Sequence, residues 1–276
     1  MHMNTAISGP SFAEELTLMP VGFQGEPLVP EGYYLTNNDW LFGSAARIAV
    51  RHRPTPPEAT TSVYLTVGNG GFESMSRLLP DEVAFLHVDH DPRVLFANQI
   101  AHQSIMQSAK RSEFYEAIGG IASGYQPGSS EAQTWQEKYL YQRERWSVVG
   151  RFMPWLSAHF LASERSFQNA KRSLQGRAIA YFAMDIFNQE HRLILASKLA
   201  RAAAEVGILN VTNVFDPYYN RQNAKVDEVI EDLPVAEGLV VLQSTNKKRT
   251  RVGLKGAPYQ RFGADVRVDR SVCLRK

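Results

Sequence analysis

The chain has 276 residues, of which 44% are hydrophobic and 11% aromatic, with 30 Lys and Arg against 28 Asp and Glu. A chain of this length can bury a sizeable core, and we expect one large domain or one domain with an insertion. No run of 18 apolar residues occurs, so we expect no membrane-spanning segment. The first residues also lack the pattern of a secretory signal. The single cysteine, Cys273, excludes an internal disulfide and a thiolate zinc site. We therefore expect a cytoplasmic protein.

The net charge of +2 is unevenly distributed along the chain. The segment from Lys247 to Lys276 carries ten Lys and Arg, against Asp265 and Asp269. Such a segment is either a patch for nucleic acid or an anionic substrate, or a solvated basic tail. Charge runs are usually solvated, so nucleic acid is not the partner that we expect.

Residues 1–60 are predicted to form an arm and a helix that precede the main domain. Prolines and glycines in residues 1–30 favour an extended arm. Asn38 or Asp39 is positioned to cap a helix that starts at Trp40. Residues 61–276 are predicted to form one Rossmann-like domain.

Strands and helices alternate in this domain. The predicted strands are 63–67, 83–88, 178–183, 208–215, 238–243, 259–262 and 266–274. The predicted helices are 72–79, 93–107, 191–206 and 225–233, and Gly207 is expected to end the third of these. Residues 108–176 show no convincing strand and are predicted to form a helical cap inserted between the second and third strands. The pattern favours an α/β fold with a Rossmann-like, doubly wound, mostly parallel seven-stranded sheet.

The first strand ends in a glycine-rich turn, Gly68 to Gly71, and the second strand ends at Asp89. Glycines let the backbone turn sharply and approach a ligand, and an acidic side chain there can accept both hydroxyls of a ribose. The turn does not fit G-x-G-x-x-G/A, because its last position is Glu73, and it lacks the Lys of a phosphate loop. A pyrophosphate is disfavoured beside Glu73, which argues against a nicotinamide-dependent reductase. A cationic ligand meets no such obstacle.

This segment resembles the first two motifs of class I S-adenosylmethionine (SAM)-dependent methyltransferases. The resemblance implies that Gly68, Gly70 and Gly71 lie near the methionine part of SAM and Asp89 near its ribose. It also implies that Asp185, after the third strand, holds the adenine amino group. The candidate cofactor-binding set is completed by their neighbours Asn69, His90 and Ile186. The alternatives are a glycine turn of another α/β protein and, for Asp185 or Asn188, a helix cap.

The end of the fourth strand carries the candidate catalytic residues. The sequence there is TNVFDPYY, which differs from the N-P-P-Y of amino-methylating nucleic-acid enzymes. It is similar to the strand end of the betaine-lipid synthase and nicotianamine synthase-like branch, which implies transfer of the 3-amino-3-carboxypropyl group of SAM. The candidate catalytic residues are Asn213, Asp216 and Tyr219, and the candidate substrate residues are Tyr34, Asn38 and Tyr218. The alternative for Asn213 and Asp216 is turn chemistry before Pro217.

The function that we expect is SAM-dependent alkyl transfer to a small molecule by attack on the sulfonium. Either the methyl group or the aminocarboxypropyl group is transferred, or the latter cyclises with release of methylthioadenosine. The alternative is a non-catalytic module that binds SAM, a nucleoside or, through the basic tail, nucleic acid. His87 and His90 bracket Asp89, but no third ligand converges on them, so we expect no metal. A homodimer is possible.

Overall fold

The structure, a computed structural model, describes residues 11–18, 49–68, 71–124, 159–211, 226–245, 249–254 and 266–267. The described strands form one sheet in the order β3-β2-β1-β4-β5-β6-β7. Its parallel strands are β1 (Thr61–Val67), β2 (Ala84–Asp89), β3 (Ile179–Ala183), β4 (Ala204–Asn210) and β5 (Val235–Thr245). β6 (Arg249–Leu254) and β7 (Val266–Arg267) continue the sheet antiparallel. The α/β, Rossmann-like prediction is confirmed, and the strand order reverses between β1 and β4, where such sheets bind ligands.

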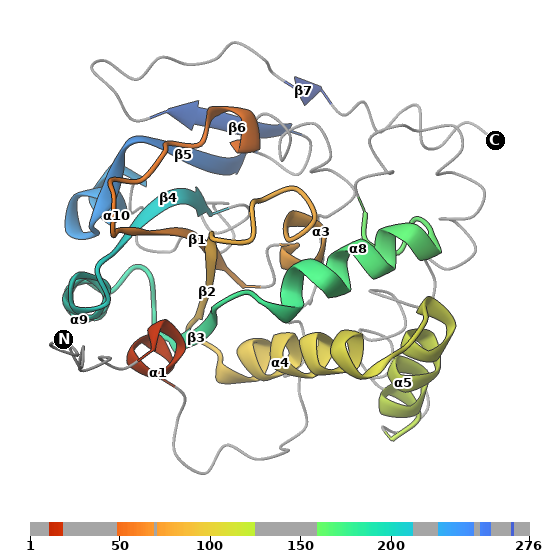
Figure 1. The fold of residues 1–276 in the computed structure, drawn as a ribbon. Helices are drawn as coiled ribbons and strands as arrows, with labels where there is room; N and C mark the ends of the chain where they lie inside the picture. Colours follow the sequence, from red (N-terminus) through yellow and green to blue (C-terminus); the bar gives the residue numbers. More distant parts are fainter. Residues whose placement is uncertain are drawn as a thin grey trace, which may run out of the picture.

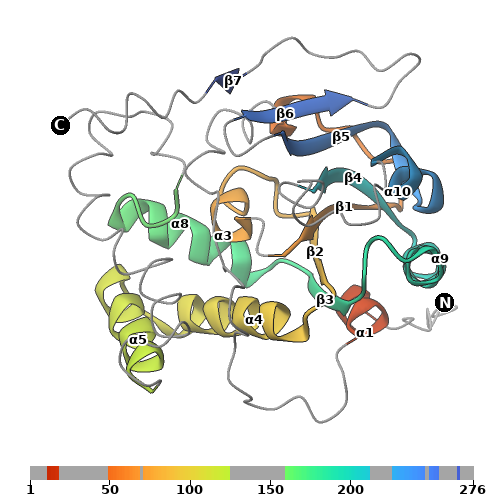
Figure 2. The same ribbon diagram turned by 180° about the vertical axis from the view of Figure 1, so that it is seen from behind.

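Helices cover both faces of the sheet (Figures 1 and 2). Tyr64 and Phe85 point to one face, whose core they share with α3 (Phe72–Met75), α4 (Pro92–Gln107), α5 (Arg111–Ser123) and α8 (Glu164–Gln175). Val63 and Leu65 point to the other face, with α1 (Phe12–Leu16), α9 (Gln189–Arg201) and α10 (Val226–Asp232). Successive strand residues alternate between faces, so buried strands contribute to two cores at once.

The helices that follow β2 and β3 begin at side-chain caps. Asp91 accepts a hydrogen bond from the Arg93 N–H at 3.0 Å at the start of α4. Asn188 accepts from the N–H groups of Glu190 and His191 at the start of α9. Each cap satisfies backbone donors that the first helical turn leaves without partners, and so fixes where the chain turns away from the sheet edge.

The predicted end of the helix at residues 191–206 is wrong. α9 ends at Arg201, and Ala203 turns the chain with a φ of 47°. Gly207 lies inside β4 at a register shift, because Val63 pairs with Val206 whereas Tyr64 pairs with Ile208. A Cβ on Gly207 would stand 2.6 Å from the Ser62 Oγ, so this glycine allows close approach of two strands and does not end a helix.

The N-terminal segment also differs from the predicted extended arm. Ser11 and Glu14 form a capping box that starts α1. Leu18 then pairs with β3, donating to the Tyr181 carbonyl at 2.8 Å and accepting from the Ala183 N–H at 2.8 Å. Residues 49–52 are helical, and residues 40–48 of the helix predicted from Trp40 lie outside the described ranges.

Residues 108–176 are described at their two ends. α5 and α8 are helices that pack in the same core as α4. Residues 125–158 lie outside the described part, so a cap over the sheet edge stays a prediction.

Candidate functional site

The turn after β1 has the backbone geometry that glycine allows. Gly68 has a φ of 71° and Gly71 a φ of 64°, both in the left-handed region. The Gly68 N–H donates to the Val88 carbonyl at 2.9 Å, and its carbonyl accepts from the Asn98 side chain at 3.1 Å. β2 and α4 therefore fix the turn at the carboxyl edge of the sheet. The predicted site residues Asn69 and Gly70 lie outside the described ranges.

Asp89 lies beside this turn. It is the last residue of β2, and its side chain is 12% exposed. Its Oδ1 accepts from the Asp91 N–H at 2.8 Å. Its Oδ2 faces Gly68, where an added Cβ would stand 3.5 Å from that oxygen. The missing side chain at Gly68 therefore leaves space next to the carboxylate.

His90 adds an ionisable group to the same edge. Its Nδ1 lies 3.3 Å from the Asp89 Oδ1, and its side chain is 56% exposed. The hydrogen bond to Asp89 raises the pKa of His90 above its ordinary value of 6.5, and burial opposes this. The carboxylates of Asp89, Asp91 and Asp185 also raise this pKa by attraction. Three negative groups thus lie within electrostatic reach of one point.

The ends of β2 and β3 are joined, which brings Asp185 near Asp89. The Met184 N–H donates to the Asp89 carbonyl at 2.8 Å. Asp185 is half-buried; its N–H donates to His191 Nδ1 at 3.1 Å, and its Oδ1 accepts from the Phe187 N–H at 2.9 Å. Asp185 therefore stabilises a turn, whereas the α9 cap is Asn188.

Ile186 does not present its side chain to the edge. It is 4% exposed within the core shared with α9, and its carbonyl accepts from Arg192 at 2.9 Å. Ile186 therefore offers packing below the edge and no polar contact from its side chain.

A row of buried polar side chains lies under this edge, and sequence reasoning missed it as a group. Thr66 pairs in register with His87 and Asn210, and His87 pairs with Tyr181. All four face the α3 and α4 side, and the most exposed of them, Tyr181, is 6% exposed. His87 stacks on Tyr181 with ring centroids 5.1 Å apart. The sequence signal that could have identified this group is the position of its members, since each lies within two residues of the carboxyl end of its strand.

Glu73, the residue that argues against a pyrophosphate, is fully buried in the first turn of α3. Burial raises the pKa of Tyr181 above its ordinary range, and the nearby Glu73 carboxylate acts in the same direction. Glu73 therefore lies near Tyr181 on the sheet, beneath the glycine turn.

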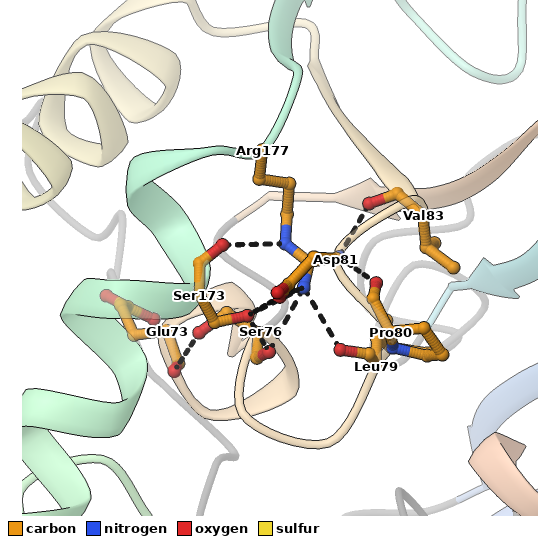
Figure 3. A network of polar contacts seen from close by, with 8 residues as sticks. All are labelled: Glu73, Ser76, Leu79, Pro80, Asp81, Val83, Ser173 and Arg177. Carbon is orange, nitrogen blue, oxygen red and sulfur yellow. Dashed lines mark hydrogen bonds and ion pairs between the residues drawn. The ribbon is translucent and has the colours of Figure 1, made fainter.

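Arg177 fixes the loop between α3 and β2 and was not predicted to have any role (Figure 3). Its side chain is 0% exposed, and its Cζ lies 4.7 Å from the centre of the Phe85 ring. Its guanidinium donates to the carbonyls of Ser76 (3.2 Å), Leu79 (3.0 Å), Pro80 (2.8 Å) and Val83 (2.6 Å). Burial lowers the pKa of Arg177, whereas Asp81 and Glu82 raise it. The loop between α3 and β2 is thus anchored by the buried guanidinium of Arg177.

The candidate catalytic and substrate residues are not placed. Asn213, Asp216, Tyr218 and Tyr219 follow β4 outside the described ranges, as do Tyr34 and Asn38 near the N-terminus. Val211 N–H donates to the Leu242 carbonyl at 2.9 Å, so the chain leaves β4 beside β5 at the same sheet edge. Within the described ranges, no three His, Cys, Asp or Glu side chains cluster as metal ligands do. Among the described helices, none is both long and apolar enough for a bilayer.

No family model matches this sequence, and no curated protein is significantly similar to it. One solved structure that resembles the chain is the rRNA methyltransferase aviRa from Streptomyces viridochromogenes, with a TM-score of 0.40 and 14% sequence identity. The match covers 78% of this chain and 76% of that chain. This is a distant resemblance.

Proposed function

We propose that this chain binds SAM at the carboxyl edge of its sheet and transfers an alkyl group from it. The observation that carries the proposal is the Asp89 carboxylate beside Gly68 at the ends of two adjacent parallel strands. A ribose needs an acceptor for its two hydroxyls and a backbone without a Cβ close by. Gly68 and Asp89 supply both.

The charges of the edge support a cationic nucleoside over a nucleotide. Asp89, Asp91 and Asp185 all act on His90 through their negative charge. Arg93, at the start of α4, forms a bidentate ion pair with Asp91, with distances of 2.8 and 2.7 Å. A phosphate would be repelled by these carboxylates, whereas a sulfonium and an ammonium are attracted by them.

The reaction that we propose is in-line attack on a carbon next to the sulfonium, with the thioether as leaving group. Methyl transfer and transfer or cyclisation of the aminocarboxypropyl group are both compatible with such a site. In this proposal Asn213, Asp216 and Tyr219 act on the reacting groups, and Tyr34, Asn38 and Tyr218 contact a small-molecule substrate. Residues 108–176 would enclose that substrate and exclude water.

Binding is the first test, by isothermal calorimetry with SAM and with S-adenosylhomocysteine. We expect Asp89→Asn to weaken both ligands by roughly tenfold to a hundredfold, because a charge-assisted hydrogen bond contributes about 1.5–3 kcal/mol. The asparagine Oδ1 can still accept from the Asp91 N–H, so the fold should persist. The exposed Glu116→Gln on α5 is the matched control and should bind as the wild type does. Absence of binding to the wild type would refute the proposal.

Turnover is the second test, by incubation with SAM alone and mass spectrometry. Methylthioadenosine above the spontaneous background would assign attack on the aminocarboxypropyl side. Binding without turnover would favour either a methyltransferase that awaits its acceptor or a non-catalytic module. A screen of small-molecule acceptors for S-adenosylhomocysteine release then separates these two.

A further inference from the structure

We propose that His90 links occupancy of this site to pH: its proton and the ribose of the ligand compete for Asp89, so that binding expels a proton. This inference rests on the proposed SAM site and concerns its regulation. It makes His90 a positioning residue for Asp89, and it requires no contact between His90 and the reacting atoms.

The geometry of Asp89 creates the competition. A carboxylate oxygen offers two lone pairs. At Oδ1 one of them accepts from the Asp91 N–H at 2.8 Å, and His90 Nδ1 lies 3.3 Å from the same oxygen. Oδ2, on the Gly68 side, is the remaining acceptor. A ribose diol that uses both oxygens must therefore replace His90 at Oδ1.

The exposure of the two side chains makes this replacement feasible. Asp89 is 12% exposed and anchored by strand β2 and the Asp91 N–H, so it stays in place. His90 is 56% exposed and follows the strand, so of the two side chains it is the one that a bound ribose can displace from Oδ1. The partner that moves is the one that carries the titrating proton.

The charged groups around His90 set the direction of the effect. From β2 and the start of α4, Asp89 and Asp91 stabilise its protonated form, and from the β3 end Asp185 does so as well. Arg93 on α4 is paired with Asp91, and His191 on α9 accepts from the Asp185 N–H. A ribose at Asp89 removes the main stabilising contact, and a nearby sulfonium adds repulsion. Both lower the pKa of His90 in the complex. Affinity therefore rises as the pH rises from the pKa of His90 in the complex to its higher pKa in the free protein.

The test compares dissociation constants at about pH 5.5 and about pH 8.5, which bracket the titration of histidine. The probes are 5′-methylthioadenosine, which has the same ribose and adenine but no charge in this range, and SAM. We expect wild-type affinity for methylthioadenosine to be roughly threefold to tenfold higher at the higher pH, since each unit of pKa change contributes up to a factor of ten. SAM should show a larger ratio because its sulfonium repels the protonated ring.

Two variants isolate His90. His90→Asn keeps a donor near the Nδ1 position but does not titrate, so its methylthioadenosine affinity should be the same at both pH values. His52→Gln, before β1, removes another histidine and should keep the wild-type ratio. Comparison with His90→Asn also corrects for titration of the amino group of SAM itself.

Proton release gives a measurement that does not depend on any variant. Calorimetry of the wild type near the His90 pKa, in buffers with different ionisation enthalpies, should show release of a fraction of a proton per ligand bound. Binding with the same pH ratio in the wild type and His90→Asn, or with no proton release, would overturn the inference and leave the SAM site standing. Failure of both ligands to bind at every pH would instead refute the SAM site itself.

Discussion

Asn210 donates a hydrogen bond to the Tyr64 hydroxyl at 2.6 Å, joining the last residue of β4 to the middle of β1 inside the core. Both side chains are 0% exposed. The hydrogen bond anchors the end of β4 to β1, just before the segment that contains Asn213 and Asp216. The described core therefore fixes where the candidate catalytic segment begins.

Tyr64→Phe should destabilise the protein by about 1–2 kcal/mol, because it removes an acceptor from a buried amide. Tyr181→Phe is the matched control on the same face of the sheet. Within the part of the chain that the structure describes, the Tyr181 hydroxyl is buried with no hydrogen-bond partner, so its removal should be neutral or stabilising. Urea unfolding of the two variants measures both effects. Equal destabilisation by both would contradict the assignment of the bond.

Gly68→Ala should damage both the fold and the site. A side chain at a φ of 71° costs about 1–2 kcal/mol, and the new methyl would occupy the space beside the Asp89 Oδ2. Gly119→Ala in α5 is the control: its added Cβ meets nothing within 4 Å, and we expect a gain of about 0.5–1 kcal/mol. Thermal unfolding and SAM calorimetry measure the two consequences separately. A Gly68→Ala variant with wild-type SAM affinity would show that the ligand does not approach this turn.

Arg177→Gln should lower the free energy of unfolding by about 3 kcal/mol or more, because several buried carbonyls lose a cationic donor. Asp81→Asn should cost less than about 1 kcal/mol, since Asp81 is 78% exposed and its ion pair is screened. Arg172→Gln, an exposed arginine near the end of α8, is the control and should stay within about 0.5 kcal/mol. Guanidinium chloride unfolding ranks the three variants, and a larger loss for Asp81→Asn than for Arg177→Gln would contradict the role of the carbonyls.

The His90 pKa in the unliganded protein should lie above 6.5, and it should fall in Asp89→Asn. A raised pKa in the folded state means that the His90–Asp89 contact stabilises the fold below the unfolded pKa and is lost as the pH rises through the folded pKa. Its contribution to stability should be small because the ring is mostly exposed. NMR titration of the imidazole signals measures the shift, and an unchanged value in Asp89→Asn would remove the physical basis of the pH link.

The sequence predicted the elements whose signals are local. The runs before Gly68 and Asp89 read directly as β1 and β2, because buried parallel strands are apolar and end at turn residues. The α1 helix carried a readable signal too, since Ser11 and Glu14 have the spacing of a capping box.

Other features depended on contacts distant in the sequence. The sequence around Gly207 is typical of a helix end, yet a glycine is needed there because Ser62 on the neighbouring strand leaves no space for a side chain. Arg177 reads as the residue before a strand, and only the fold brings to it the carbonyls of a loop almost a hundred residues earlier. Periodicity carries no information on such pairings, so the sequence indicates a candidate edge at Gly68 and Asp89 but not the residues that support it.

The single bridge of Leu18 to β3 has a consequence for self-association. β3 is the outermost strand on its side, and its outward Tyr181 carbonyl and Ala183 N–H are already paired with Leu18. An open strand edge is a template on which further chains add strands, and aggregation often starts there. Here a short stretch of the same molecule occupies part of that template. If two copies of this chain associate, continuation of the sheet across β3 is the arrangement that α1 and Leu18 disfavour.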